Sequence, residues 1–221
     1  MKHKLALVHT GVGVVEPIVA LVKELSPDTE VLNFVDDTIV RAIAANGNVV
    51  PPDVFRRMIG YFVNAEQVGA DAALLTCSSI SESVDVARPF VKIPLFKIDE
   101  PMADKAVATA SHIGVVATLR TTLEPTKRLI LSRAEKQGKP VTLHERLCKG
   151  AFEAWQRGDG ATHDRIVKEA VTEVLAECPV VVLAQASMAR AVQSLGSAQD
   201  RVLTSMRLGV ARAADYLRGK A

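Results

Sequence analysis

Leu5-Ala-Leu-Val-His-Thr10 recurs 108 residues later as Ile113-Gly-Val-Val-Ala-Thr118, and this pair of segments decides the fold that we expect. The same offset places Ala72-Ala-Leu-Leu-Thr-Cys-Ser-Ser79 on Val180-Val-Val-Leu-Ala-Gln-Ala-Ser187 without a gap. Any two buried strands resemble each other, because buried parallel strands are apolar throughout. A Glu-Pro dipeptide that also repeats at this offset is not required by strand composition, and it favours a true internal repeat.

Short apolar runs alternate with longer stretches of helical period, which is the pattern of parallel strands buried beneath helices. The sequence therefore predicts an α/β fold of two pseudo-symmetric lobes, with the active site in the cleft between them. We expect each lobe to be a four-stranded, mainly parallel sheet flanked by helices, with residues 1–98 plus 205–221 in lobe one and 99–204 in lobe two. The expected strands are Leu5–His9, Val31–Val35, Ala72–Thr76, Ile93–Ile98, Ile113–Thr118, Val141–His144, Val180–Ala184 and Val202–Leu203.

Composition and charge exclude several classes of protein. Lys and Arg total 27 against 25 Asp and Glu, and aromatic residues make up 4%, so neither phosphate neutralisation nor base stacking is well supplied. We expect no nucleic-acid partner. The start, Met1-Lys-His-Lys4, is followed by only four apolar residues, Leu5–Val8, before His9 and Thr10, and this run is too short for a membrane span or a signal-peptide core. Three cysteines are an odd number and argue against a disulfide framework, so we expect a cytoplasmic protein without a membrane partner.

Polar residues follow four of the expected strands, at the carboxyl ends where ligands bind in parallel sheets. Backbone N–H groups at helix starts, together with hydroxyls, suit a small carboxylate or an oxyanion. An alternative interpretation is that the hydroxyl residues only cap helices. The predicted substrate-binding residues are His9, Thr10, Ser78, Ser79, Thr118, Thr121, Gln185 and Ser187.

Cys77 is the candidate catalytic residue. It lies between an expected strand and an expected helix, and a helix start lowers the pKa of a thiol. A buried, inert cysteine is the alternative. Cys178 precedes its strand and is predicted to be structural at the opposite edge, while a solvated helical position is an equally good interpretation of Cys148.

Metal and nucleotide sites have little support in the sequence. The five histidines show no paired spacing with Cys or carboxylates of the kind that zinc sites use, so we expect no metal. Gly11-Val-Gly13 with Asp36 and Asp37 is a fragment of a dinucleotide-binding pattern, but Glu16 stands where the third glycine belongs.

Four segments together resemble the aspartate/glutamate racemase superfamily, which includes hydantoin racemases, maleate isomerases and arylmalonate decarboxylases. The segments are Leu74–Ser79, Ile93–Met102, Ile113–Thr118 with Thr121-Thr122, and Val181–Ala189. The resemblance covers nearly the whole chain and implies two α/β lobes, catalysis without a cofactor, a small carboxylate-bearing substrate and homo-oligomerisation.

Racemases of this superfamily use one cysteine on each face of the substrate α-carbon, and the resemblance gives that role to Cys77 alone. Gln185 stands where the second cysteine belongs, and an amide is neither a general acid nor a general base. The sequence therefore predicts a cofactor-independent enzyme that uses one cysteine for proton transfer or thiol addition next to a carboxylate or carbonyl. An amino-acid or hydantoin racemase and a non-catalytic binder of small acids are the alternatives.

Overall fold

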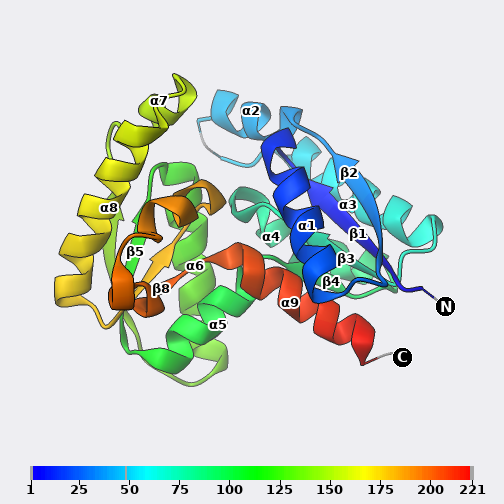
Figure 1. Ribbon diagram of the computed structural model, residues 1–221. Helices are drawn as coiled ribbons and strands as arrows, with labels where there is room; N and C mark the ends of the chain where they lie inside the picture. The colour runs from blue at the N-terminus through cyan, green and yellow to red at the C-terminus, as the bar shows by residue number, and fades with distance from the viewer. Residues whose placement is uncertain (1, 48, 220–221) are drawn as a thin grey trace. The chain divides into compact units, whose positions relative to one another are not determined.

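The computed structural model describes residues 2–47 and 49–219, and the chain divides into two compact units. Unit 1 comprises Met1–Pro101 and Met206–Ala221, and unit 2 comprises Met102–Ser205. Figure 1 shows that strands and helices alternate along the chain in each unit. Each unit contains one four-stranded sheet whose strand pairs are all parallel.

The sheet of unit 1 has the strand order β2-β1-β3-β4. Its strands are β1 (Lys4–His9), β2 (Glu30–Val35), β3 (Ala72–Leu75) and β4 (Leu95–Lys97). Its helices are α1 (Val15–Leu25), α2 (Thr38–Ala45), α3 (Pro52–Gln67), α4 (Glu82–Ala87) and α9 (Ser205–Arg218), with short 3₁₀ turns η1 (Val12–Val14), η2 (Ser78–Ile80) and η3 (Arg88–Phe90).

Helices bury both faces of this sheet, which explains why β1 is apolar at successive positions. Ala6 and Val8 pack against residues of α3 and α4, whereas Leu5 and Leu7 face the opposite way. On that second face α1 and α9 pack against the strands (Figure 1). Successive side chains of a strand point to opposite faces, so an uninterrupted apolar run is what a two-sided core requires.

The sheet of unit 2 has the matching order β6-β5-β7-β8. Its strands are β5 (His112–Ala117), β6 (Thr142–Leu147), β7 (Val180–Leu183) and β8 (Val202–Leu203). Its helices are α5 (Glu100–Thr109), which begins at the junction of the units, α6 (Arg120–Lys136), α7 (Ala151–Gln156) and α8 (Gly160–Glu177), with 3₁₀ segments η4 (Ala186–Val192) and η5 (Gly196–Arg201).

Strand register confirms the internal repeat. Leu5 pairs with Ala72 in unit 1, and Ile113 pairs with Val180 in unit 2, so both partners move by the same 108 residues. The prediction of an α/β fold with two four-stranded parallel sheets flanked by helices is confirmed.

Two strands differ in length from the sequence prediction by more than one residue. β4 begins at Leu95 rather than Ile93, because Pro94 has no N–H to contribute to the ladder. β6 runs on to Leu147 although Glu145 and Arg146 are charged. It is an edge strand with exposed side chains, so an apolar pattern could not reveal its full extent.

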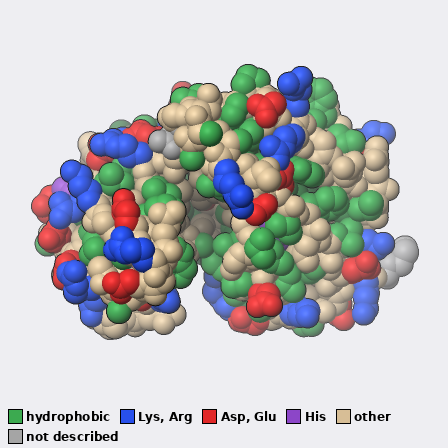
Figure 2. All heavy atoms as spheres, turned by 90° about the horizontal axis from the view of Figure 1, so that it is seen from above, with side chains coloured by type: hydrophobic (Ala, Val, Ile, Leu, Met, Phe, Trp, Pro, Cys, Tyr) green, Lys and Arg blue, Asp and Glu red, His purple; other side chains and the backbone are tan. Residues whose placement is uncertain are grey.

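Charged side chains of both signs are mixed on the surface. On the face displayed in Figure 2, Lys and Arg side chains are interspersed with Asp and Glu, in agreement with the net charge of +2. Within residues 2–47 and 49–219, no helix combines the length and apolarity needed to cross a membrane.

Gly114 in the middle of β5 provides a test of the packing in unit 2. A Cβ atom at this position would lie 2.3 Å from Cγ1 of Val174 and 3.1 Å from Cγ2 of Val181. We expect Gly114→Ala to lower the free energy of unfolding by about 1–3 kcal/mol in urea titrations, because the core must shift to admit the methyl group. Gly60→Ala in α3 is the control, since no atom lies within 4 Å of its added Cβ, and this variant should be neutral or more stable.

Candidate active site at the carboxyl ends of the strands

Cys77 lies at the carboxyl end of the sheet in unit 1, two residues beyond the last residue of β3. It is the N-cap residue of η2 and has an extended backbone, with φ −128° and ψ 118°. Thr10 follows β1, the strand that pairs with β3, so the parallel register brings the two residues together. Cys77 is half-buried, whereas Cys148 and Cys178 are buried.

Four polar groups surround the sulfur of Cys77. The hydroxyls of Thr10 and Ser79 and the backbone N–H groups of Ser79 and Ile80 form hydrogen bonds with it. We define these residues as the Cys77 cluster. Burial raises the pKa of the Cys77 thiol, and these hydrogen bonds oppose that rise without cancelling it. The sequence-based expectation of a lowered pKa is therefore not met, because burial outweighs the helix start.

His9 is the last residue of β1, directly before Thr10 of the Cys77 cluster, and it is fully buried. Its Nε2 is 3.0 Å from Oδ1 of Asn33, and its Nδ1 is 3.0 Å from Oγ1 of Thr76. Burial lowers the pKa of the imidazole and outweighs the hydrogen bond to Asn33, which acts in the opposite direction. The lowered pKa favours a neutral ring with one donor and one acceptor nitrogen. This geometry favours a role for His9 in positioning Thr76 and the loop that carries Cys77.

Asp99 belongs to the same edge of unit 1, although the sequence analysis did not select it. It follows β4 and is 1% exposed, and its Oδ1 accepts a hydrogen bond of 2.9 Å from the hydroxyl of Ser81. Its Oδ2 is buried and meets no donor among the described residues. Burial raises the pKa of Asp99 to about 6, against the influence of Ser81, Lys97 and Ser78. The sequence signal that could have identified Asp99 is a carboxylate directly after the expected strand Ile93–Ile98.

Gln185 occupies in unit 2 the place that Cys77 occupies in unit 1. It is the N-cap residue of η4, with φ −136° and ψ 139°, and it is half-buried like Cys77. Its Oε1 accepts hydrogen bonds from the backbone N–H of Thr118 at 2.6 Å and from the Thr118 hydroxyl at 2.9 Å. We define this pair as the Gln185 cluster. Thr118 thus contacts Gln185 as Thr10 contacts Cys77.

The remaining predicted residues also lie at these edges. Ser78 is in η2 beside Asp99, Thr121 is in the first turn of α6, and Ser187 is in η4, all three half-buried. The N-cap residues of η1, η2, α6 and η4 are Gly11, Cys77, Leu119 and Gln185. The hydroxyl residues at the strand ends are therefore not the N-caps that the alternative interpretation required.

Cys148 is placed differently from its solvated-helix interpretation. It follows β6 directly, donates its backbone N–H to the carbonyl of Ala117 at 2.8 Å and is 2% exposed. Burial raises the pKa of its thiol to about 11. Cys148 is thus part of the apolar core of unit 2.

Asp36, considered above as part of a dinucleotide pattern, is already engaged within unit 1. Burial would raise the pKa of its carboxyl, but hydrogen bonds from Thr38, Tyr61 and Arg57 hold that pKa at about 2. Tyr61 donates its hydroxyl to Oδ2 of Asp36 at 2.6 Å, and Arg57 forms an ion pair with the same oxygen. This network favours a structural role for the carboxylate over recognition of a ribose.

Comparison with known proteins identifies the family. Residues 7–213 match the model of the Asp/Glu/Hydantoin racemase family. The fold is similar to that of allantoin racemase from Klebsiella pneumoniae, with a TM-score of 0.70, 18% identity, and coverage of 99% of this chain and 88% of that one. No protein of curated function matches the sequence significantly.

Two glutamate racemases have the same fold. The enzyme from Aquifex pyrophilus gives a TM-score of 0.68 at 16% identity, covering 96% of this chain and 83% of that one. The enzyme from Francisella tularensis, solved with D-glutamate, gives a TM-score of 0.73 at 12% identity, covering 99% of this chain and 82% of that one. The chain belongs to the Asp/Glu/Hydantoin racemase family, and the predicted membership in an isomerase and racemase superfamily is confirmed.

The pKa of Cys77 can be tested by alkylation. Cys77 is more exposed than the other two cysteines, so iodoacetamide should modify it first. Because only the thiolate reacts and burial raises the pKa, the rate should still be rising at a pH where a free cysteine analogue measured in parallel has reached its plateau. A plateau at or below that of the analogue would contradict the expectation, and Cys77→Ala should remove the fast phase.

Asp99 should make stability pH-dependent. The unfolded carboxyl ionises near 3.8, whereas the folded one keeps its proton until about pH 6, so stability present at low pH is lost as pH rises through this interval. Urea unfolding at pH 4 to 7 should show a loss of about 2 kcal/mol in the wild type that Asp99→Asn lacks. Parallel curves for the two proteins would contradict the assignment.

Proposed function

We propose that this protein is a cofactor-independent enzyme that transfers a proton at the carbon next to a carboxylate or carbonyl of a small acid, with Cys77 as its acid and base. The observation that carries the proposal is the set of donors around the sulfur of Cys77. The Thr10 hydroxyl and the N–H groups of Ser79 and Ile80 meet a group that alternates between thiol and thiolate. Such donors stabilise the thiolate at the moment when it forms.

The chemistry requires both protonation states of Cys77. As a thiolate, its sulfur takes the α-proton, and the electrons of the C–H bond move into the adjacent carboxylate or carbonyl to give an enolate. As a thiol, it returns a proton to that carbon and becomes the thiolate again. The raised pKa keeps the thiol protonated near neutral pH, which suits the donating step, and makes the proton-abstracting step faster at higher pH.

A single base predicts a particular stereochemical outcome. A proton that leaves and returns on one face of the α-carbon exchanges with solvent but does not invert the carbon. Inversion needs a second acid on the opposite face, and the residue that matches the second cysteine of the superfamily is Gln185, whose amide neither gains nor loses a proton near neutral pH.

Gln185 is suited to substrate recognition instead. The hydrogen bonds from Thr118 engage its Oε1, so its NH₂ group is the part that can donate to a ligand. The same bonds fix the orientation of the amide. A carboxylate or carbonyl oxygen is the chemical group that this donor would bind.

The named relatives suggest the substrates to test. One was solved with D-glutamate and another is an allantoin racemase, so an amino acid dicarboxylate and a cyclic ureide are represented among proteins of this fold. We infer that this chain accepts a small molecule with an acidic C–H next to a carboxylate or carbonyl. A panel of amino acids, hydantoins, allantoin and dicarboxylic acids covers that class.

Deuterium exchange in D₂O tests Cys77 directly. The wild type should introduce deuterium at the α-carbon of one substrate of the panel, as measured by NMR or mass spectrometry. Cys77→Ala and Cys77→Ser should lower that rate by at least about 100-fold, because each removes the group that carries the proton. Cys148→Ala is the matched control, since it removes a cysteine of the core and should leave the exchange rate unchanged. Undiminished exchange in Cys77→Ala would exclude the proposal.

The enantiomers distinguish this proposal from a racemase. Deuterium that enters only the starting enantiomer supports one-face exchange by Cys77, whereas deuterium in both enantiomers supports racemisation by a second group.

A non-catalytic binder of small acids is the second candidate, and Gln185 is the residue that favours it. This function predicts that a carboxylic acid of the panel raises the melting temperature while no deuterium enters it. Gln185→Ala and Thr118→Val should then reduce the thermal shift, and Cys77→Ala should leave it unchanged.

A further inference from the structure

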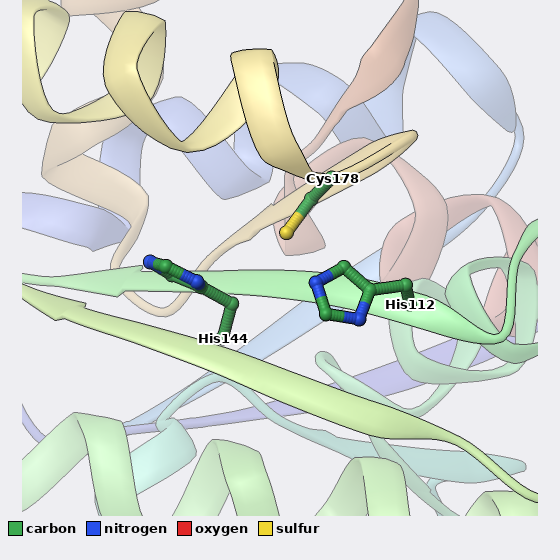
Figure 3. A group of neighbouring side chains, drawn as sticks. All are labelled: His112, His144 and Cys178. Atoms are coloured by element: carbon green, nitrogen blue, oxygen red, sulfur yellow. The ribbon is translucent and has the colours of Figure 1, made fainter.

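His112, His144 and Cys178 converge at the amino-terminal edge of the sheet in unit 2. His112 is the first residue of β5, His144 is the third residue of β6, and Cys178 immediately follows α8. Each side chain offers one ligand atom, and these atoms all lie within 4.8 Å of one another (Figure 3). Figure 3 shows the sulfur of Cys178 above the two imidazole rings, which come from neighbouring strands. Gln185 lies at the other end of the same sheet.

Strand register explains why the two histidines share a face. His112 pairs with Thr142, and Gly114 pairs with His144, so all four positions belong to one face of the sheet. That face is covered by α8, whose Val174 would collide with any side chain at position 114. A Cβ atom added to Gly114 would lie 3.6 Å from Cβ of Cys178, so the glycine lets the end of α8 place its cysteine beside the histidines.

Hydrogen bonding leaves one nitrogen of His112 available to a cation. Nδ1 of His112 lies 2.9 Å from Oγ1 of Thr142, and that hydroxyl donates to the carbonyl of Ser111 at 3.3 Å. The hydroxyl therefore accepts from Nδ1–H, and Nε2 carries the lone pair. Histidine ligands of metals are commonly oriented by such a bond on their other nitrogen.

Cys178 and His144 are also held from outside the cluster. The guanidinium of Arg201 donates to the carbonyls of Leu175 and Cys178, both at 2.7 Å, and to that of Pro179 at 2.9 Å. These three bonds fix the backbone on either side of the thiol. Oε2 of Glu177 lies 3.2 Å from Nδ1 of His144 and places a carboxylate beside the ring.

We propose that His112, His144 and Cys178 bind one zinc ion, with the fourth coordination position open to solvent. Two imidazoles and a thiolate suit a borderline-soft cation, whereas magnesium and calcium prefer oxygen ligands. A tetrahedral zinc site places its ligand atoms roughly 3.3–3.8 Å apart, so atoms that lie within 4.8 Å of one another need to approach by no more than about 1.5 Å. The ion would link β5, β6 and the turn between α8 and β7, and it would stabilise unit 2.

This site was not predicted from the sequence. Zinc motifs are identified by ligands a few residues apart, whereas these three are separated by more than thirty residues each. Only the parallel register and the end of α8 bring them together.

Zinc titration of the metal-free full chain, followed by a competing chromophoric chelator, tests the proposal. We expect one zinc ion per chain and an affinity at least about 100-fold weaker in Cys178→Ser and in His112→Ala. Cys148→Ala and Cys77→Ser should bind as the wild type does, which distinguishes this thiol from the other two. Thr142→Val should weaken binding by about 10–100-fold through the orientation of His112. Unchanged zinc affinity in both Cys178→Ser and His112→Ala would overturn the proposal.

Two further measurements distinguish the loss of a zinc ligand from misfolding of a variant. Cobalt(II) bound by the wild type should give a thiolate charge-transfer band, and Cys178→Ser should lack it while keeping a native circular dichroism spectrum. His144 is partly exposed, so His144→Gln is the variant whose fold is least disturbed, and zinc should raise its melting temperature less than that of the wild type. A cobalt spectrum without a thiolate band in the wild type would also overturn the proposal.

Discussion

The pairing of the first strand of each unit with the third is the constraint on which both clusters depend. The backbone N–H of Thr76 donates to the carbonyl of Val8 at 3.0 Å, and that of Ala184 donates to the carbonyl of Val116 at 3.0 Å. The donors of these two hydrogen bonds immediately precede Cys77 and Gln185 in the chain. The last hydrogen bond between the paired strands therefore fixes the position of the thiol in unit 1 and of the amide in unit 2. Helices bury both faces of each sheet, which prevents the strands from slipping in register.

Much of this arrangement could be predicted from the sequence, because apolar strands and a constant offset are visible without coordinates. The strand order, the two sheets and the strand-end positions of Cys77 and Gln185 follow from that pattern. The pKa values and hydrogen-bond partners of side chains that are far apart in the sequence could not be predicted. The burial of the Asp99 carboxyl and its hydrogen bond from Ser81 could not be predicted from the sequence, because they arise only in the folded chain. The pKa of the Cys77 thiol is raised by burial, which no local motif reveals.

The two units place chemically different side chains at equivalent positions. Thr10 donates to a sulfur that can change its charge, whereas Thr118 donates to an amide oxygen that cannot. A repeated backbone therefore supplies the same geometry twice, while the side chains decide whether a proton can be moved there. Family membership establishes the fold and the class of enzyme, and the two equivalent positions carry a thiol in unit 1 and an amide in unit 2.

The strand registers of the two units show which residues of unit 1 are equivalent to Gly114 and to the three potential zinc ligands. The residue of unit 1 equivalent to Gly114 is Ala6, and those equivalent to His112, His144 and Cys178 are Lys4, Leu32 and Ala70. None of the three potential ligands has a counterpart. Duplicated domains can therefore diverge at opposite ends of the same strands: one end retains related polar pairs in both copies, and the other is free to acquire a feature in a single copy.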